Sequence, residues 1–597
     1  MAMSTKKKVI VIGAIILVVL VAVLCAVFLT QSADTGSLKE VVATTKQGKL
    51  AGEWVDAGDP AHFRYAAFRG IPYAQPPLGK LRFKGPKPLP PWEGIRPATT
   101  EGNTCIQDGF VGSEDCLYMN VYTPQMPSAE NNPKLPVYVF IHGGAFQHGN
   151  SNADGYGPDF LITQDIVVVT MNYRTAIMAS LSLDTDELPG NAGLKDQLHV
   201  LRWVKENIEN FGGDPSKITL GGHSSGSVSA CWLAIVPQTK DLIRAAIIQS
   251  GTAVSGWSST NKHIEFAKAI YKHLTGTTTD DKSAMTSVFK SANYLDLYYA
   301  AENATLLIQE TKGLGTDISF FYAPYIEQRE QGEEEKLITK DAESYIIDKD
   351  ANNIPMIIGE TKQEWTRFFS LLGMFENETQ LNEHIQNLIT YVPPSIRPGS
   401  DTQELLRIKE HVPTVNVDDF VKKLREFYFK NDNDKECCTN CKMSKYLHQA
   451  YIMADTSHFI RLRSKYIQEP TFAFLFNLKS DYNNDITYLP HYLQSDVVHG
   501  DEMGYIWKKE KYTYDYGNNT AAVASRRLVR MITNFVKEGN PTPKIDDEIT
   551  VKWQPVTHGG EETYLEITEN LEQRKGSAAD AEIWSEIFSS YRANKSP

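Results

Sequence analysis

The sequence predicts an α/β protein with one large, mostly parallel sheet and helices on both of its faces. Short, largely apolar runs recur along the chain, as expected of strands buried on both faces, at residues 137–141, 166–171, 245–249 and 356–359. Residues 193–211 add an amphipathic pattern with apolar side chains at helical spacing, namely Leu194, Leu198, Leu201, Val204 and Ile208. Apolar strands that alternate with helices are typical of a parallel sheet with two covered faces.

The composition is that of an ordinary globular protein. Of the 597 residues, 42% are hydrophobic and 22% are charged, and the formal net charge is −13. This charge, with no basic face to offset it, argues against a nucleic-acid partner. Because no shift in composition divides the chain after Leu38, we expect a single domain over residues 38–592. The acidic run 332–336 is interpreted as a solvated surface loop, and the sequence leaves the oligomeric state open.

The N-terminus predicts a membrane segment. Three lysines, at positions 6–8, precede an almost unbroken apolar run whose helix would span about 30 Å, the thickness of a bilayer core. We therefore expect a signal anchor over residues 9–30, between a cytoplasmic tail (1–8) and a stalk (31–37). The positive-inside rule makes this a type II protein with its bulk extracellular or lumenal. The alternative is a cleaved signal peptide and a secreted protein, although residues 31–33 form a poor cleavage site.

Four Asn-x-Ser/Thr triplets fit an exported, glycosylated body, at Asn303, Asn377, Asn518 and Asn594. The body itself begins with a predicted β-hairpin over residues 41–52. The proline-rich stretch 68–94 is expected to be an ordered loop, because proline disfavours both helix and central strand. A strand is expected over residues 114–122.

A glycine-flanked, serine-containing turn follows the predicted strand at Ile218 and Leu220. The sequence Gly-His-Ser-Ser-Gly at 222–226 lies between that strand and a segment of small, helix-compatible residues. A strand–turn–helix of this kind is the context in which a nucleophile elbow exposes its serine, here Ser224. Taken alone, the motif is also compatible with an ordinary glycine-rich turn.

A second glycine-containing loop comes directly after the buried strand 137–141. It reads His142-Gly143-Gly144-Ala145. Glycines let main-chain N–H groups approach a ligand closely, and convergent N–H groups of this kind stabilise a developing negative oxygen. The two loops together favour acyl-transfer chemistry over two unrelated turns.

The chain resembles the type-B carboxylesterase family, also called cholinesterase-like, of the α/β-hydrolase fold. The similarity covers nearly all of the chain beyond the N-terminal segment and lies in the two loops above and in residues 68–83, 113–122, 189–197, 211–215, 249–251 and 535–541. The resemblance implies a serine ester hydrolase that forms an acyl-enzyme and needs neither a metal nor an organic cofactor. Its substrate would be a small carboxylic ester.

The resemblance also implies the residues of the site. Ser224 would be the nucleophile, His499 the base and Glu364 the acid, in the chain order that this fold requires. Glu360 is the nearest rival to Glu364. The oxyanion donors would be the main-chain N–H groups of Gly144, Ala145 and Ser225.

Weaker assignments follow from the same resemblance. Ser250 matches a serine that bonds near the triad in relatives, although it is also compatible with a turn serine. Trp257, Phe320 and Phe321 match positions that line an acyl pocket, with core packing as the alternative.

Several residues depart from the family pattern without deleting a catalytic group. His223 replaces a frequent glutamate beside the nucleophile, and we expect it to be a packed, neutral imidazole. Ala145 replaces a common glycine in the predicted oxyanion loop, residues 142–145. Thr175-Ala176 replaces a usual Leu-Gly pair and Trp365 replaces a glycine, and both changes would narrow the entrance to the site.

The cysteines add three expectations. Cys105 and Cys116 match the family's first disulfide, whose loop here lacks the tryptophan that holds choline, so a choline-ester specialist is not expected. Cys231 is expected to be a buried free thiol. One local disulfide with one remaining thiol is the favoured state of Cys437, Cys438 and Cys441, ahead of a zinc site completed by His448.

A hypothesis from another functional class is that the chain is an adhesion protein and not an enzyme. Some relatives of this fold are adhesion proteins that have lost catalysis and bind partners through their outer face. Those proteins characteristically lack a triad member, whereas this chain keeps all three. The enzyme is therefore the favoured reading, and both roles could coexist.

Overall fold

The computed structural model describes ten stretches of the chain, namely residues 40–58, 63–107, 111–311, 321–329, 332–366, 426–428, 445–446, 448–487, 494 and 496–577. The predicted tail, membrane segment and stalk (1–8, 9–30 and 31–37) lie outside these residues. Within them, no helix combines the length and the apolar character needed to cross a membrane.

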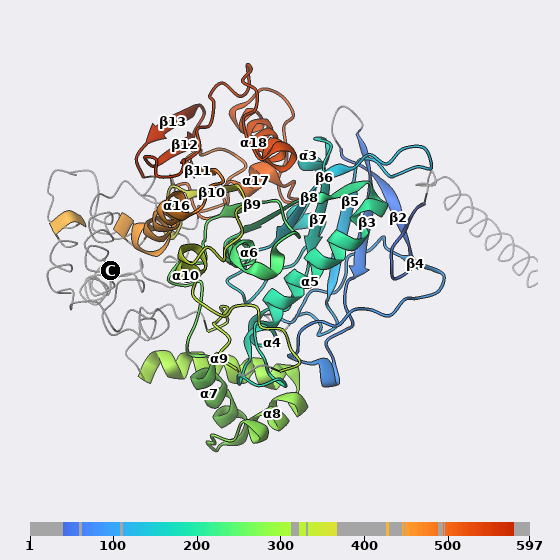
Figure 1. Ribbon diagram of the computed structural model, residues 1–597, viewed down its shortest axis with the longest axis vertical. Helices are drawn as coiled ribbons and strands as arrows, with labels where there is room; N and C mark the ends of the chain where they lie inside the picture. The colour runs from blue at the N-terminus through green and yellow to red at the C-terminus, as the bar shows by residue number, and fades with distance from the viewer. Residues whose placement is uncertain are drawn as a thin grey trace, which may run out of the picture.

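A 13-stranded sheet forms the centre of the described part (Figure 1). Its strands are β1 Val41–Thr44, β2 Lys49–Asp56, β3 Arg64–Pro72, β4 Ile95–Pro97, β5 Tyr118–Thr123, β6 Leu135–Ile141, β7 Val167–Met171, β8 Gly213–His223, β9 Ala245–Gln249, β10 Met356–Thr361, β11 Thr471–Phe476, β12 Thr563–Ile567 and β13 Leu571–Lys575. The spatial order is β1-β2-β3-β5-β7-β6-β8-β9-β10-β11-β12-β13, with β4 beside β2.

The sheet is mixed, with a parallel centre. From β7 through β6, β8, β9, β10 and β11 to β12, every neighbouring pair is parallel. The pairs at both ends of the order, from β1 to β7 and between β12 and β13, are antiparallel. The predicted parallel sheet is thus its central part.

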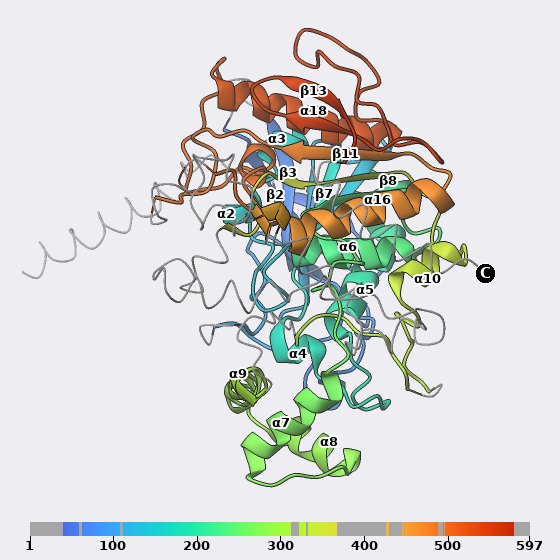
Figure 2. The same ribbon diagram turned by 90° about the vertical axis from the view of Figure 1, so that its left-hand side faces the viewer.

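Helices cover both faces of this sheet. The described helices of four or more residues are α2 Ala153–Tyr156, α3 Asp159–Ile162, α4 Ala176–Ser180, α5 Ala192–Asn207, α6 Ser225–Ile235, α7 His263–Thr275, α8 Lys282–Ser291, α9 Tyr294–Thr311, α10 Ala342–Ile347, α16 Ala454–Tyr466, α17 Met503–Ile506 and α18 Thr520–Glu538, with the 3₁₀ turn η3 Ile208–Phe211 and the π-helical turn η7 Gln449–Met453. Figure 2 shows α3 and α18 on one side of the sheet and α5, α6 and α16 on the other. Helices α7–α9 form a separate group below it (Figures 1 and 2).

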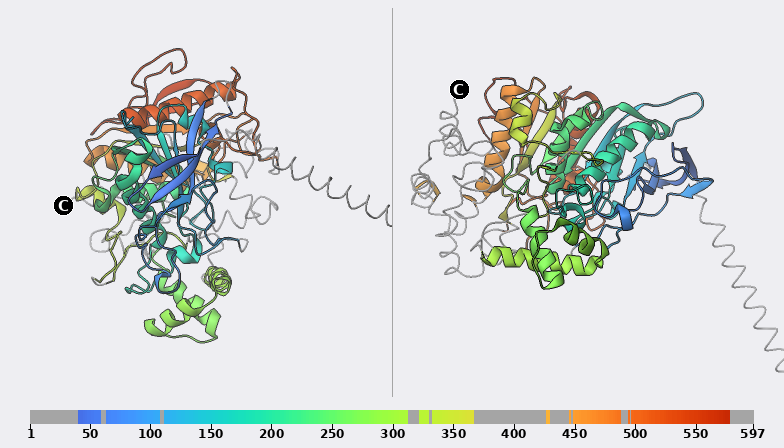
Figure 3. Two further views of the ribbon diagram at one scale, coloured as in Figure 1. Left: turned by 90° about the vertical axis from the view of Figure 1, so that its right-hand side faces the viewer. Right: turned by 60° about the horizontal axis from the view of Figure 1, so that its bottom comes forward.

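Alternation along the central strands explains the two covered faces. In β6, the side chains of Val137, Val139 and Ile141 belong to the core on the α5 and α6 side. Tyr138 and Phe140 point the other way, into the core beneath α18. Every second residue of a strand faces the same side, so a run that is apolar at every position needs cover on both sides. The N-terminal strands and α16 lie at opposite ends of the sheet (Figure 3).

Most predicted elements are confirmed, and three need correction. The stretch 68–94 is not loop throughout, because β3 continues to Pro72 across an irregularity between Phe68 and Ile71, and the later prolines follow its end. The strand expected from residue 114 begins only at Tyr118.

The third correction concerns the acidic run 332–336, which is not simply a solvated loop. Glu334 is buried, accepts a hydrogen bond from the main-chain N–H of Gly85 at 3.1 Å and pairs with Lys87 at 3.0 Å. The run therefore fastens the proline-rich block to the body. A charge pattern cannot reveal such a partner, which lies 249 residues away along the chain.

Candidate active site

Ser224 lies at the sharp turn between β8 and α6. Its φ of 59° and ψ of −127° form a conformation that residues with side chains rarely adopt, as a nucleophile elbow requires. The glycines around it are needed for steric reasons. A Cβ on Gly222 would lie 2.2 Å from the carbonyl oxygen of Gly226, and one on Gly226 would lie 2.3 Å from that of Ile141. The turn is therefore packed directly on the end of β6.

His499 and Glu364 come together beside this turn. His499 bonds through Nδ1 to Oε2 of Glu364, and its ring packs on that of His223, with 4.6 Å between the ring centroids. Glu364 follows β10 and is fully buried, and the exposed fraction of His499 is 8%. Three distant parts of the chain thus meet at the carboxyl ends of β8 and β10.

The carboxylate of Glu364 is enclosed by donors. Its Oε1 accepts the hydroxyl of Ser250 at 2.6 Å and the main-chain N–H of Thr361 at 2.6 Å. Burial alone would raise the pKa of Glu364, but the charge and hydrogen bond of His499 and these two donors outweigh burial and lower the pKa below its usual value. The predicted contact of Ser250 near the triad is thus present.

Glu360 has a different environment. It lies on β10, buried, and burial followed by repulsion from Glu364 raises its pKa well above the usual range. Glu502, three residues after His499, behaves similarly, since burial and then Glu364 raise its pKa to about 8. Of these three buried carboxyl groups, Glu364 alone has a pKa below its usual value and is therefore the one that holds a negative charge most readily.

The loop after β6 lies against the same turn, since an added Cβ on Gly143 would be 2.9 Å from Cβ of Ser224. Gly144 and Ala145 have positive φ values of 126° and 54°. Within the described part of the chain, the N–H groups of Gly144, Ala145 and Ser225 donate no hydrogen bond to another residue. Unpaired N–H groups beside a strained serine suit a negative oxygen.

Close contacts hold this loop against the elbow. A Cβ added to Gly143 would lie 2.9 Å from Cβ of Ser224. His142 stacks on Tyr173, whose hydroxyl donates to the carbonyl oxygen of His142 at 2.7 Å. Burial lowers the pKa of His142 to about 4, although a hydrogen bond to the Gly143 carbonyl opposes this, so the ring is neutral and donates from Nδ1.

His223 is packed between two parts of the site. A Cβ on Gly500 would lie 3.0 Å from Cε1 of His223, and one on Gly143 would lie 3.4 Å from its Nδ1. Burial, and then the charges of His499 and Lys509, lower the pKa of His223 well below its usual value. These surroundings agree with the packed, neutral imidazole expected from the sequence.

The two described pocket candidates differ in position. The ring of Trp257 lies against Gly251, where an added Cβ would be 2.8 Å from Trp257 and 3.0 Å from the carbonyl oxygen of Ser224. Phe321 instead stacks on Phe266 of α7, with 4.9 Å between centroids, inside the core. Phe320 lies outside the described residues.

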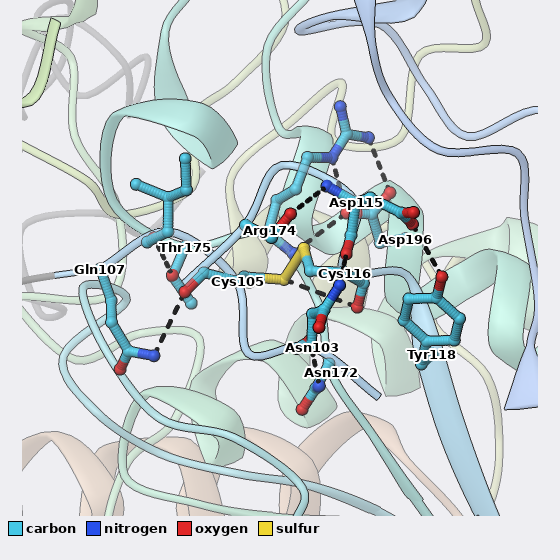
Figure 4. The surroundings of a disulfide bond; sticks show 12 residues. Asn103, Cys105, Gln107, Asp115, Cys116, Tyr118, Asn172, Arg174, Thr175 and Asp196 are labelled. Atoms are coloured by element: carbon cyan, nitrogen blue, oxygen red, sulfur yellow. Dashed lines mark hydrogen bonds and ion pairs between the residues drawn. A yellow bond between two sulfur atoms is a disulfide. The ribbon is translucent and has the colours of Figure 1, made fainter. Parts of the chain in front are cut away.

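The disulfide joins Cys105 and Cys116, as the resemblance implied. Figure 4 shows Gln107 and Thr175 on one side of it. Thr175 donates its hydroxyl to the carbonyl oxygen of Ile106 at 2.9 Å. Gln107 accepts the N–H of Gly149 at 2.8 Å, and Gly149 packs on His142. The disulfide loop therefore supports the far end of the oxyanion loop.

The remaining substitutions also have structural consequences. Ala176 adopts a positive φ of 50° and donates its N–H to the carbonyl oxygen of Phe146 at 2.7 Å, which ties the 175–176 segment to the oxyanion loop. Trp365, next to the acid, is buried. Cys231 is the buried free thiol expected, with a pKa that burial raises to about 12.

The predicted glycosylation sites differ in setting. Asn303 lies within α9, and its side-chain amide donates to the carbonyl oxygen of Tyr299 at 2.7 Å. Asn518 is exposed just before α18. Asn377 and Asn594 lie outside the described residues, as do Cys437, Cys438 and Cys441.

Sequence reasoning missed three residues of the site. Phe146 directly follows the motif at 142–145 and carried no prediction of its own, yet its ring centroid lies 6.4 Å from that of Trp257. Gln107 gave no signal beyond its place in the disulfide loop. His448 was considered only as a zinc ligand, whereas its Nδ1 accepts the main-chain N–H of Glu364 at 2.8 Å.

Comparison with known proteins agrees with this geometry. A model of the carboxylesterase family matches residues 39–584. Juvenile hormone esterase of Heliothis virescens is 33% identical over 385 residues, which are 62% of this chain and 66% of that protein. Esterase FE4 of Myzus persicae is 30% identical over 505 residues, 82% of this chain and 83% of that protein.

A solved structure shares the fold. The crystal structure of juvenile hormone esterase from Manduca sexta, with OTFP covalently attached, aligns with a TM-score of 0.76 and 26% identity. The alignment covers 93% of this chain and 100% of that one.

Proposed function

The chain belongs to the carboxylesterase family and is a carboxylic ester hydrolase, and from this premise we propose that Ser224, His499 and Glu364 are its catalytic triad. The observation that carries the proposal is the bond from Nδ1 of His499 to the buried carboxylate of Glu364, next to the strained Ser224 turn. The remaining imidazole nitrogen, Nε2, is then the atom that exchanges a proton with Ser224.

The reaction follows from these roles. Nε2 of His499 takes the proton of Ser224 as Oγ attacks the ester carbonyl, and the C–O bond to the alcohol breaks when the imidazolium returns that proton to it. Water, activated by the same imidazole, then hydrolyses the acyl-enzyme. Glu364 keeps the proton on Nδ1 and stabilises the imidazolium.

The negative oxygen of each tetrahedral intermediate would be held by the main-chain N–H groups of Gly144, Ala145 and Ser225. What supports this is their availability beside Ser224 and the close approach that Gly143 permits. Losing one such donor typically costs about 3–4 kcal/mol of transition-state stabilisation.

Replacement of the nucleophile tests the proposal. Ser224→Ala should reduce the turnover of p-nitrophenyl acetate by about 10³-fold or more without changing the melting temperature. Ser216→Ala, at an exposed serine of β8, is the matched control and should retain full activity. Equal turnover by wild type and Ser224→Ala would remove Ser224 from the mechanism.

The substrate class we propose is a neutral or apolar carboxylic ester. Phe146 and Trp257, both buried aromatic residues beside the nucleophile turn, support an apolar acyl site. The names of the relatives, juvenile hormone esterase and esterase FE4, agree with ester substrates. A series of esters with graded acyl and alcohol chains should show kcat/KM rising with apolar length, and a preference for charged esters would contradict this class.

We also propose that residues 9–30 anchor the protein in a membrane, with the catalytic domain extracellular or lumenal. The apolar run after three lysines supports the anchor, and the Cys105–Cys116 disulfide supports an oxidising compartment. Carbonate-washed membranes should retain the full-length protein. Recovery of a shortened protein from the medium would instead show a cleaved signal and secretion.

A further inference from the structure

The main chain of the acid segment 361–364 is fastened at every N–H group. Thr361 donates to the carboxylate of Glu364 itself. The next two N–H groups donate to main-chain carbonyl oxygens at the end of β11 and in the segment just before His499, at 3.0 and 2.9 Å. The last one, of Glu364, donates at 2.8 Å to a side chain, Nδ1 of His448.

His448 is suited to accept this hydrogen bond. Its exposed fraction is 4%, and burial lowers its pKa to about 3, with the charge of Glu364 opposing this shift and that of Lys362 adding to it. The imidazole is therefore neutral across the pH range of ester hydrolysis. Because an amide N–H can only donate, Nδ1 carries the lone pair and the ring proton is on Nε2.

The element that carries His448 also reaches the other side of the site. His448 directly precedes the π-helical turn η7, and η7 runs into α16. Near the start of α16, Asp455 accepts the main-chain N–H of Gly256 at 2.9 Å, next to Trp257. Single π-helical turns are frequent at functional sites, where they redirect side chains. One helical segment thus holds both the acid and the loop of a pocket residue.

We propose that His448 is a positioning residue of the ester-hydrolysing site, which fixes the main chain of Glu364 and through it the carboxylate that orients His499. The inference rests on the triad proposed above. His448 touches neither the substrate nor the reacting atoms. Its effect is geometric, because the side chain of Glu364 can hold His499 in place only if its own main chain is fixed.

Three variants of the full-length chain separate this role from simple packing. His448→Asn places an amide oxygen near the position of Nδ1 and keeps the acceptor. His448→Gln places its oxygen farther out, near the position of Nε2, and His448→Leu removes the acceptor. The matched control is His458→Leu on α16, which removes an equally buried imidazole, bonded to Glu343 at 2.6 Å.

The expected result is a loss in kcat rather than in binding. His448→Leu and His448→Gln should lower kcat by about 10- to 100-fold, the usual size of a misplacement of about 1 Å, while KM changes less than threefold. The ascending limb of kcat/KM against pH should move to lower pH, because a less well held Glu364 stabilises the His499 imidazolium less. His448→Asn should stay within threefold of wild type, and His458→Leu should lose thermal stability but keep kcat.

Every outcome either supports or overturns the positioning role of His448. If His448→Leu and His448→Gln keep wild-type kcat and pH profile, or if Asn is as impaired as Gln, the positioning role is wrong. If the Leu variant does not fold, the comparison of Asn with Gln carries the test. Ser224→Ala, assayed beside them, keeps the two proposals apart, because undiminished turnover by that variant would overturn the triad itself and this inference with it.

Discussion

At the residue scale, the site depends on glycines, which have no side chain, as much as on the reactive side chains. Ser224 reaches its strained conformation because Gly222 and Gly226 let two main-chain segments meet at distances that a Cβ would prevent. Gly143 lets the oxyanion loop touch Ser224 directly. The backbone strain is maintained because packing from every side fixes it.

The contact of Gly143 gives a sharp prediction. Gly143→Ala should abolish ester hydrolysis, with kcat reduced by at least about 100-fold, because its methyl group would lie 2.9 Å from Cβ of Ser224 and 2.7 Å from the carbonyl oxygen of His223. Gly155→Ala, at a helical glycine with no atom within 4 Å of an added Cβ, should behave as wild type. Steady-state kinetics of both variants checks this, and an active Gly143→Ala would show that the loop can move away.

The hydroxyl of Ser250 provides a second test at this scale. Ser250→Ala removes a hydrogen bond to the ionised carboxylate of Glu364, an interaction worth about 1.5–3 kcal/mol. We expect kcat to fall about 10-fold with KM nearly constant. Ser258→Ala removes a comparably buried hydroxyl that bonds the carbonyl oxygen of Ala253 at 2.7 Å, away from Glu364, and should leave kcat unchanged. Equal losses in the two variants would assign the effect to packing.

At the scale of elements, the parallel centre of the sheet brings the site together. The oxyanion loop follows β6, Ser224 follows β8 and Glu364 follows β10. In the sheet, β6 and β8 are neighbours, and β9 alone separates β8 from β10. Parallel strands end at the same edge, so loops that are distant in sequence meet there. The antiparallel strands at both ends of the order contribute none of these three groups.

The disulfide loop is an element whose removal should be felt at the site. Breaking Cys105–Cys116, which closes a loop with a sequence separation of 11, should cost about 3 kcal/mol of unfolding free energy. It should also lower kcat severalfold, because Gln107 and Ile106 brace Gly149 and Thr175.

Denaturant unfolding and kinetics of the Cys105→Ala, Cys116→Ala double variant check both effects. Reductant should lower the stability of wild type more than that of the double variant, since Cys231 is a free thiol in both and any disulfide among Cys437, Cys438 and Cys441 is common to both. Unchanged kcat in the double variant would show that the loop keeps its position without the bond.

At the scale of the whole molecule, burial on both sheet faces places carboxyl groups where they cannot ionise freely. Burial raises the pKa of Asp455 to about 8, with an opposing hydrogen bond from Gly256 and a further rise from Glu343. The native state thus keeps a proton that the unfolded chain releases above its ordinary pKa of 3.8. This group therefore lowers stability as pH rises from about 3.8 to about 8.

Replacing Asp455 by a residue that cannot ionise should flatten the pH dependence of the free energy of unfolding. Asp455 contributes a slope of up to about 1.4 kcal/mol per pH unit in that window. Asp455→Asn cannot ionise and keeps an oxygen for the N–H of Gly256, so its stability should fall less between pH 5 and pH 8 than that of wild type. Denaturant unfolding at several pH values measures both slopes, and parallel curves would mean that Asp455 is ionised in the folded protein.

The sequence by itself determined what depends on local pattern. The central strands, the long helix after Asn191 and the strained turn at Ser224 were predictable in this way, whereas the Cys105–Cys116 pair was implied by the family resemblance. Buried parallel strands and nucleophile turns carry short-range signatures, and the family resemblance supplied Glu364 and His499. The strand within the proline-rich stretch was missed, because strand pairing across a bulge is not a local property.

Only the tertiary structure decided which polar groups meet. Nothing near His448 in sequence indicates that it accepts the N–H of Glu364, 84 residues away, and nothing in the acidic run points to Gly85. It also decided that, of the buried carboxyl groups of Glu360, Glu364 and Glu502, only that of Glu364 has a lowered pKa. Burial and hydrogen-bond partners set these states, and both arise only when distant segments pack together.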